Sequence, residues 1–556
     1  MIERLVEYWL NSASERSYQA AFVQMLVAEG HRVLHSTRHA PIEFGKDIIS
    51  VAPDGVPCAY QLKGNPGGRL TLAQFRDMKG QIQELVTQPI PLPGLPPDQH
   101  RSYRVTNGWI EEEVQRSIGD MNVTWERQRF PKDALEIIQK GDLLGKATKL
   151  GAALWPTEVA DLGALVDLLS HRGDDILPAE KMHRLLTSMY RLAGPDAEKA
   201  PTGGALQRLV TSAALLVAIA TRNFAGASNH FAIVSAWVLF STYTIAACTR
   251  AGLTMVDGIL AESLAAARQA IFEALDALIE ELAARPNIIE GRPLSDLEFQ
   301  GARRARLNGL LSSYWLWCRR DRLEPANLAT VERILPREWA PRGLWGEAVV
   351  PQFLAHYWYM SRRDGGFGPE VDLARLLAFI VQTQLSGDEI RYLAAPHYTI
   401  ADVVRHNTAD FLGAGNDPYD AVSFRDASHF VEGLLHLVVR TNLKQTCKFI
   451  WPSVTRLTLR SFEVEEPWQF CMFHSERGLN CMKIPKPTGS WSKLQAEAAA
   501  FDTPKVPPLL RADPILLLLY SFIVPQRATP DVIRFLGREF SDVWFLPQPR
   551  PARTTT

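Results

Sequence analysis

Residues 43–64 contain side chains of the types that suit metal-assisted phosphodiester cleavage. Asp47 lies near the start of one predicted strand, and Gln61 and Lys63 alternate along a second. Pro53-Asp54-Gly55 between the two strands is a strong turn signal. Side chains alternate along a strand, so Gln61 and Lys63 share one face, and the turn brings Asp47 opposite residues 61–63. The sequence therefore predicts that Asp47, Gln61 and Lys63 meet at one end of a hairpin.

Each of these residues has a chemical role available in such a reaction. The carboxylate of Asp47 can bind a hard divalent cation, and the Gln61 amide oxygen and the Leu62 carbonyl can add neutral oxygen ligands. The metal would polarise the phosphate and lower the pKa of an attacking water. Lys63 could position or deprotonate that water, or neutralise the developing charge.

Alternating helices and strands over about the first 150 residues would position this group. Ser12 and Glu15 form a capping-box pattern before a helix that ends at Gly30. A second helix is predicted after Thr71, and a third runs from Gly108 to near Ile118. The predicted strands are Arg32–Ser36, Lys46–Ala52, Pro57–Lys63, Ser102–Thr106 and Asn122–Trp125. This order predicts a compact mixed α/β domain.

The motif and the order of elements resemble the PD-(D/E)xK, or restriction-endonuclease-like, nuclease superfamily. Gly45-Lys-Asp47, a strand, a turn and Gln61-Leu-Lys63 resemble its Mrr-like branch, which often has Gln in place of the second acid. Val105-Thr-Asn-Gly108 fits the later strand and turn of the family. The resemblance covers residues 12–126 and implies an αβββαβ core, Mg²⁺ or Mn²⁺ as cofactor, and nucleic acid, DNA favoured over RNA, as substrate. It also implies a role in prokaryotic anti-phage defence.

The family's first helix usually carries a glutamate about eleven residues before a glycine. Counting back from Gly30 gives Gln19, so the role either falls to an amide or passes to Glu15, one turn earlier on the same face. Glu43 could touch the metal from a loop, and the glycine-rich segment 64–68 could close over substrate. The resemblance thus implies Asp47, Gln61, Lys63, Glu15 and Gln19 as catalytic residues, with Asp47, Gln61 and Leu62 as metal ligands.

From about residue 150 helical segments dominate the pattern. We expect residues 1–150 to form the nuclease-like domain, 151–462 an α-helical domain of stacked helices, and 463–556 an irregular connector with a last helical piece over Ile515–Phe540. The helical region is expected to bind substrate, a partner protein or a second copy of the chain. The resemblance does not extend to this region.

Composition narrows the functional classes. The 556 residues include 60 Lys and Arg against 61 Asp and Glu, a formal net charge of −1, which excludes a polybasic protein that coats nucleic acid by net charge alone. The six cysteines form no C-x-x-C pair and fit reduced thiols in a cytosol, so we expect a cytoplasmic location. Phe231–Cys248 is largely apolar, and we expect a buried helix there, with no membrane partner.

Several other sequence motifs give weaker evidence for a functional site. Gly141–Lys146 departs from a phosphate-binding loop in spacing and lacks its Ser or Thr, so any ATPase would be a partner protein. His31, His35 and His39 do not predict a zinc site, and Arg391 with His397 fits an RNase spacing only loosely. Arginines from 303 to 322 around Tyr314–Trp317 fit either a nucleic-acid surface or a solvated helix face.

Three functions stay open at this point. The first is a metal-dependent nuclease. The second is a catalytically weak or inactive scaffold or sensor with a nuclease fold, which binds nucleic acid or a partner without cutting. The third is an RNA-cutting enzyme whose helical region holds the chemistry, in which case removal of residues 1–150 would leave cleavage intact.

Overall fold

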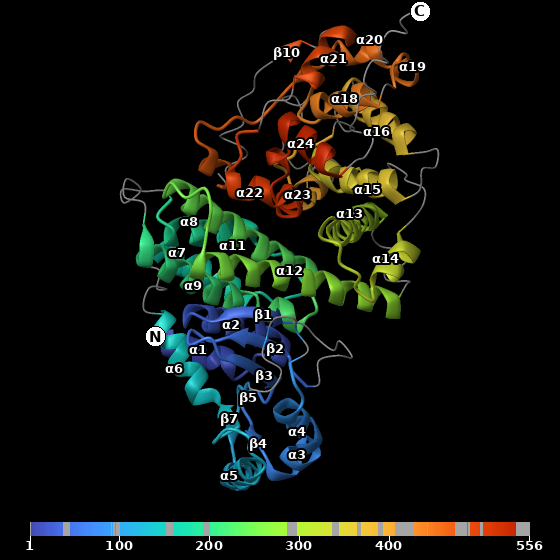
Figure 1. The fold of residues 1–556 in the computed structure, drawn as a ribbon. Coiled ribbons are helices and arrows are strands. Elements are labelled where there is room, and N and C mark those ends of the chain that lie inside the picture. Colours follow the sequence, from blue (N-terminus) through green and yellow to red (C-terminus); the bar gives the residue numbers. More distant parts are fainter. Residues whose placement is uncertain are drawn as a thin grey trace, which may run out of the picture. The chain divides into compact units, whose positions relative to one another are not determined.

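The chain divides into two compact units, Met1–Ala274 and Leu275–Thr556, which are described separately. The structure is a computed structural model and is mostly helical, with a small N-terminal mixed sheet (Figure 1). It describes residues 2–36, 45–90, 92, 95, 100–151, 159–192, 201–285, 297–335, 344–363, 369–386, 393–405, 426–441, 443–472, 486–487, 490–500 and 504–540.

A five-stranded mixed sheet forms the centre of the N-terminal part of unit 1. Its order is β1-β2-β3-β5-β7, in which β1, β2 and β3 are antiparallel and β3, β5 and β7 are parallel. This confirms the predicted α/β character of the region. The strands are β1 (Arg32–Ser36), β2 (Ile48–Val51), β3 (Pro57–Lys63), β5 (Arg101–Thr106) and β7 (Leu135–Ile138).

The predicted hairpin is present, and its register follows from the turn. Gly55 has a φ of +83°, which favours glycine, and the Val56 amide donates to the Asp54 carboxylate at 3.2 Å. Ile48 then pairs with Tyr60, and Asp47 directly precedes this last pair, at the end of the hairpin where Gln61 also lies. The backbone amide of Asp47 donates to the Tyr60 carbonyl at 2.8 Å and holds Asp47 against β3.

Helices cover both faces of this sheet. On one face Phe22 of α2 packs edge-on against Tyr60 of β3, with ring centroids 5.5 Å apart. On the other face Ile49, Phe75 and Ile82 share a buried cluster with residues of α5. The elements here are α1 (Ile2–Leu10), α2 (Glu15–Ala28), β4 (Arg69–Leu70), α3 (Leu72–Asp77), α4 (Lys79–Thr87), β6 (Trp109–Ile110), α5 (Glu112–Arg127) and α6 (Lys140–Gly151).

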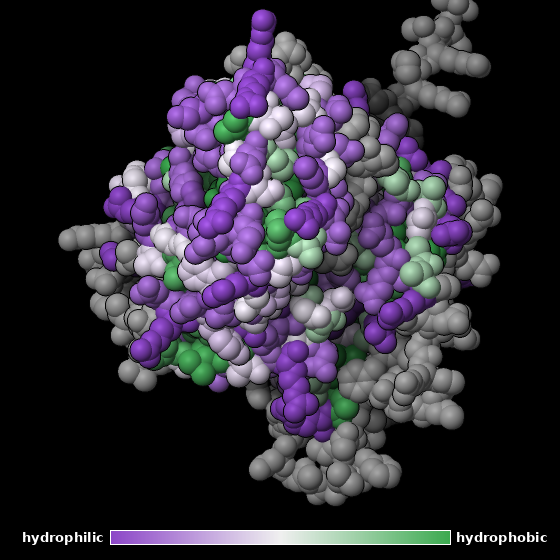
Figure 2. Space-filling view, turned by 90° about the horizontal axis from the view of Figure 1, so that it is seen from below, coloured by the Kyte–Doolittle hydropathy of each residue, from purple (hydrophilic) through white to green (hydrophobic). Residues whose placement is uncertain are grey.

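The prediction of a strand at Asn122–Trp125 was wrong, as was the predicted end of a helix near Ile118. Helix α5 continues through both to Arg127, and the strand that follows is β7. Val114, Ile118 and Trp125 are buried at helical spacing, so a single amphipathic helix buries all three on one face. The opposite face of α5 is exposed, and α5 lies at the bottom of the picture in Figure 1. The surface seen from below in Figure 2 is largely hydrophilic.

The rest of unit 1 is a helical layer. Its helices are α7 (Val159–Ser170), α8 (Ala179–Met189), α9 (Gly203–Ala220), α10 (Arg222–Gly226), α11 (His230–Arg250) and α12 (Gly258–Ala284), the last of which passes the unit boundary. By length and composition α9 and α11 could each cross a membrane, and buried residues make up 67% and 89% of their apolar windows.

These helices pack on the sheet domain. Helix α2 lies against α9. Gln24 of α2 is 1% exposed and binds Ser263 of α12 twice, donating to its carbonyl at 3.0 Å and accepting from its hydroxyl at 2.7 Å. The predicted boundary near residue 150 therefore falls inside unit 1.

Unit 2 is built mainly from helices around the pair α13 and α15. The last helical piece, predicted over Ile515–Phe540, is two helices separated by a 3₁₀ turn at Pro525–Arg527, because prolines 525 and 530 interrupt it. A small sheet has the order β10-β9-β8. The elements are α13 (Leu297–Asp321), α14 (Leu328–Ile334), η3 (Glu347–Val349), α15 (Val350–Arg363), α16 (Pro369–Gln384), β8 (Ala427–Ser428), α18 (Val431–Arg440), α19 (Lys444–Cys447), α20 (Trp451–Val454), β9 (Thr458–Leu459), η6 (Pro467–Cys471), β10 (Lys486–Pro487), α21 (Trp491–Ala499), α22 (Pro508–Ala512), α23 (Pro514–Ile523), η7 (Pro525–Arg527) and α24 (Pro530–Phe540).

Candidate functional site

Two carboxylates bind successive amides along one edge of β3. Asp47 accepts the backbone N–H of Leu62 at 2.6 Å, and Glu15, the first residue of α2, accepts that of Gly64 at 3.1 Å. Amides two residues apart on a strand point the same way and are spaced by about 7 Å. The carbonyl of Leu62 points to the same edge and lies between these two amides. Asp47, Glu15 and the Leu62 carbonyl therefore form a row of oxygen atoms.

Gly64 allows Glu15 to approach this edge. A Cβ atom on Gly64 would lie 3.0 Å from the backbone nitrogen of Glu15, closer than normal van der Waals contact. Any other residue at this position would push the start of α2 away from β3. The close approach brings the helix carboxylate within reach of the strand.

Gln61 supplies a buried amide with an unused acceptor. Its side chain is 5% exposed, and Oε1 has no hydrogen-bond partner among the residues that the structure describes. Gly45, with a φ of +74°, packs on this amide, since a Cβ there would lie 2.9 Å from Gln61 Nε2. A buried carbonyl oxygen without a partner is unfavourable unless an ion or a water satisfies it, so it fits the ligand role predicted for Gln61.

Lys63 ends β3 with an exposed side chain. Its backbone amide donates to the Tyr18 hydroxyl at 3.1 Å, and that hydroxyl donates to the Val105 carbonyl at 3.4 Å. Burial raises the pKa of Tyr18 well above its usual range, with a further rise from the charge of Glu15. Tyr18 is therefore a neutral clamp between α2, β3 and β5 that fixes the backbone from which Lys63 extends.

Gln19 lies apart from this row of oxygens. Its amide is 5% exposed and donates to the Ser36 hydroxyl on β1 at 3.3 Å. Of the two predicted helix residues, the structure brings Glu15 to the edge of β3 and uses Gln19 to hold β1. Glu43, the other predicted acid, lies outside the described residues.

The glycine-rich segment after Lys63 is fastened to the domain. The amide of Asn65 donates to Asn107 Oδ1 at 2.8 Å, and Asn107 Nδ2 donates to the carbonyls of Leu10 and Ala13, both at 2.8 Å. A Cβ on Gly108 would lie 2.8 Å from Asn65, so this turn requires glycine. These contacts hold the segment against the end of α1 and the start of α2.

Arg104 lies beside the candidate site and was not predicted from the sequence. It is 1% exposed on β5 and pairs in register with Gln61 of β3. One guanidinium nitrogen contacts the Met78 sulfur at 2.9 Å, and Nε has no hydrogen-bond partner within the described part of the chain. Burial lowers the pKa of Arg104, while Tyr18, Asp47 and Glu15 raise it. The available signal was an arginine at the centre of a strand, next to Val105 and Thr106, which are also buried.

Other parts of the chain offer weaker candidates for a metal or nucleic-acid site. The described residues contain no group of three or more His, Cys, Asp and Glu side chains that could hold a metal ion, so a cation at Asp47 would need amide and carbonyl oxygens as well.

No protein-family model, curated protein or solved structure matches this chain.

The arginine-rich segment of α13 does not offer stacking surfaces. Tyr314 and Trp317 are 0% and 3% exposed, so their rings belong to the core of unit 2. Arg319 forms an ion pair with Glu332 at 3.4 Å, and Arg320 donates to the Ala512 carbonyl at 3.3 Å. These contacts favour a structural role for this segment over a nucleic-acid surface.

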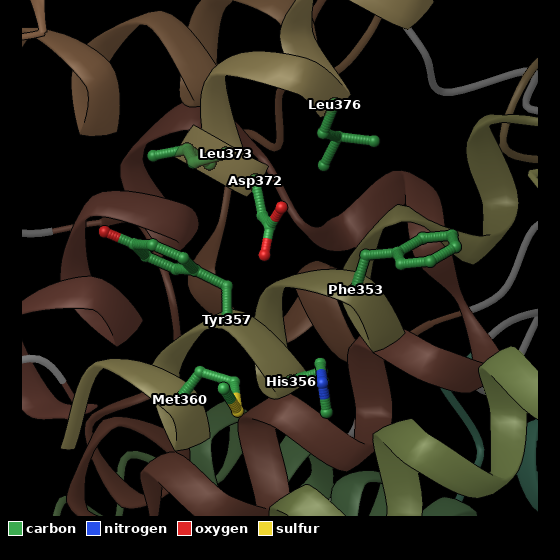
Figure 3. Close-up of a pocket in the computed structure, with 7 residues that line it drawn as sticks. All are labelled: Phe353, His356, Tyr357, Met360, Asp372, Leu373 and Leu376. Carbon is green, nitrogen blue, oxygen red and sulfur yellow. The ribbon is translucent and has the colours of Figure 1, made fainter. Parts of the chain in front are cut away.

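A narrow, mainly apolar pocket lies between α15 and α16 in unit 2 (Figure 3). Phe353, Leu373 and Leu376 line it, and Asp372 points from α16 toward α15. His356, 1% exposed, shares a 3.3 Å hydrogen bond with Ser312 through Nδ1, and its Nε2 has no partner among the described residues.

The loosely spaced RNase pair, Arg391 and His397, cannot be compared with the structure, because Arg391 lies outside the described residues.

Replacing His356 is expected to change how stability depends on pH. Burial lowers the pKa of His356 to about 4, so the folded protein favours the neutral ring. The stabilisation is complete above pH 6.5 and is lost as pH falls through 4, and it amounts to about 3 kcal/mol. Denaturant unfolding of wild type and His356→Phe between pH 7 and 4 measures it. We expect the variant to lose less stability than wild type, and parallel curves would contradict the assignment.

Proposed function

We propose that the sheet domain of unit 1 is a metal-dependent nuclease that acts on nucleic acid, with DNA favoured over RNA. The observation that carries the proposal is the row of oxygens from Asp47, Leu62 and Glu15 along β3, next to the buried, unpartnered oxygen of Gln61. Carboxylate, amide and carbonyl oxygens are the ligands of Mg²⁺ and Mn²⁺. The arrangement of β1, β2, β3 and β5, with α2 on one face, is compatible with the αβββαβ core of the PD-(D/E)xK superfamily.

The side chains have distinct roles in this proposal. Asp47, Gln61 and the Leu62 carbonyl would hold the cation, with Glu15 as an additional acid from the helix. When bound, the cation supplies Lewis acidity to the phosphate and to a water molecule. The exposed Lys63 orients the water or balances negative charge on the phosphate. A role in prokaryotic anti-phage defence, with a partner ATPase or sensor or a second copy of the chain, extends this proposal.

A second candidate function is a scaffold or sensor that uses the nuclease fold without cutting. The observation that favours it is the replacement of acids by Gln61 and Gln19, together with the buried positive charge of Arg104. A site with fewer carboxylates holds a divalent cation less tightly. The two candidates differ in one measurable property, divalent-metal-dependent hydrolysis.

Cleavage assays with Lys63→Ala test the proposal directly. Purified wild type is incubated with plasmid, linear DNA and RNA, with Mg²⁺, with Mn²⁺ and with EDTA. We expect cleavage only with metal. The cleavage rate of Lys63→Ala should fall by about 100-fold or more, because the substitution removes the ammonium group beside the phosphate. The matched control is Lys79→Ala, another exposed lysine, at the start of α4.

Each outcome separates the candidates. Equal cleavage by wild type and Lys63→Ala would overturn the assignment of Lys63. No metal-dependent hydrolysis of any substrate would favour the scaffold over the nuclease.

A further inference from the structure

Arg104 and Gln61 leave complementary buried atoms unused at adjacent positions. They are register partners on parallel strands β3 and β5, so their side chains leave the sheet on the same face. Gln61 Oε1 is an acceptor and Arg104 Nε a donor, and neither has a hydrogen-bond partner among the described residues. Unused buried polar atoms are unfavourable, so two of them side by side indicate a position prepared for a polar ligand.

The charges around this position balance before any ligand arrives. Asp47 and Glu15 contribute two negative charges on the edge of β3, and Lys63 and Arg104 contribute two positive charges. Arg104 lies near enough to both carboxylates to feel their charge. Lys46 does not enter this balance, because its ammonium lies at α4, where it donates to the Glu84 carbonyl at 3.4 Å and the Glu84 carboxylate offsets its charge.

A divalent cation entering a balanced site meets repulsion from a buried guanidinium. Because Arg104 is 1% exposed, water screens this repulsion poorly, and the side chain has little room to turn away. A phosphodiester group brings the negative charge that offsets the cation, and its oxygens can accept from a guanidinium. Metal and nucleic acid should therefore favour each other's binding.

We propose that Arg104 makes divalent-metal binding at Asp47 depend on a nucleic-acid phosphate, so that the metal and the nucleic acid bind together. This inference rests on the proposed nuclease site and adds that the metal and the nucleic acid occupy it together. The coupling is reciprocal, so metal must raise nucleic-acid affinity by the same factor by which nucleic acid raises metal affinity. Arg104 acts through charge and is a positioning residue.

Mn²⁺ binding measured by electron paramagnetic resonance, which reports free Mn²⁺, tests the rule without relying on activity. The full-length wild-type chain is titrated with Mn²⁺ alone and with phosphorothioate DNA and RNA duplexes that resist cleavage, and the Mn²⁺ that each duplex binds without protein is subtracted. We expect nucleic acid to tighten Mn²⁺ binding by about tenfold or more. Adding Arg104→Met should give the tighter affinity without nucleic acid, and Arg104→Lys, which keeps the charge, should not.

Arg101→Met is the matched control. Arg101 lies on the same strand, is half exposed, and pairs with Asp54 at the far end of the hairpin at 2.6 Å. Its removal should leave Mn²⁺ affinity unchanged. Far-UV circular dichroism checks the fold of each variant, and the comparison with and without nucleic acid holds even if Arg104→Met does not fold.

The outcomes distinguish the inference from the proposed function. Mn²⁺ affinity that is the same with and without nucleic acid, and unchanged by Arg104→Met, overturns the inference and leaves the nuclease proposal standing. Absence of Mn²⁺ binding in every sample, together with absence of cleavage by the wild type, overturns both.

Discussion

Asp47→Asn is expected to reduce metal-dependent cleavage by more than about 100-fold while leaving the fold intact. The asparagine keeps the size of the side chain and an oxygen for the Leu62 amide, which Asp47 binds at 2.6 Å. It removes the negative charge that a hard divalent cation requires. Single-turnover cleavage at saturating Mg²⁺ measures the loss, and thermal unfolding verifies the fold.

The matched control for Asp47→Asn is Asp54→Asn in the hairpin turn. Asp54 is half exposed, accepts from the Val56 amide and pairs with Arg101, so its change alters a turn and leaves the row of oxygens untouched. Cleavage by Asp54→Asn should stay near wild type. If both variants retained full cleavage, Asp47 would not be a metal ligand.

Asn107→Ala is expected to destabilise unit 1 by about 3 kcal/mol or more. Asn107 is 0% exposed and joins three segments, accepting from Asn65 and donating to Leu10 and Ala13. Alanine leaves three backbone groups without their partner, and each unsatisfied buried group costs about 1–3 kcal/mol. Urea unfolding followed by circular dichroism measures the shift.

Asn11→Ala provides the control for this substitution. Asn11 is exposed, so its change should alter stability by no more than about 0.5 kcal/mol. A similar loss of stability in both variants would show that the three hydrogen bonds of Asn107 do not account for the destabilisation. Hydrogen exchange at the Asn65 amide gives a second, local measure.

The hairpin could be predicted because its signals are local. Alternation fixes which residues of β3 share a face, and Asp54-Gly55 fixes the turn, so the placement of Asp47 at the same end of the hairpin as Gln61 follows from counting residues. The same reasoning failed at Asn122–Trp125. Trp125 and its neighbours suit a strand by type, but burial against the sheet selected a helix.

The contacts between elements could not be predicted from spacing. Glu15 and Gln19 lie on neighbouring turns of one helix, and only the packing of α2 decides that Glu15 reaches Gly64 while Gln19 reaches Ser36. Arg104 was missed for a related reason. Its meaning comes from its pairing with Gln61 across two strands that are far apart in the sequence.

The buried pairing of Gln24 with Ser263 limits how the three candidate functions can be separated by experiment. Excision of residues 1–150 would strip α9 and α12 of the helix they pack on, and isolation of that same stretch would leave Gln24 and the apolar side chains of α2 facing solvent. A fragment that failed to cut would then report on misfolding and aggregation instead of chemistry. In this protein, an activity can be assigned to one region by changing single residues in the intact polypeptide.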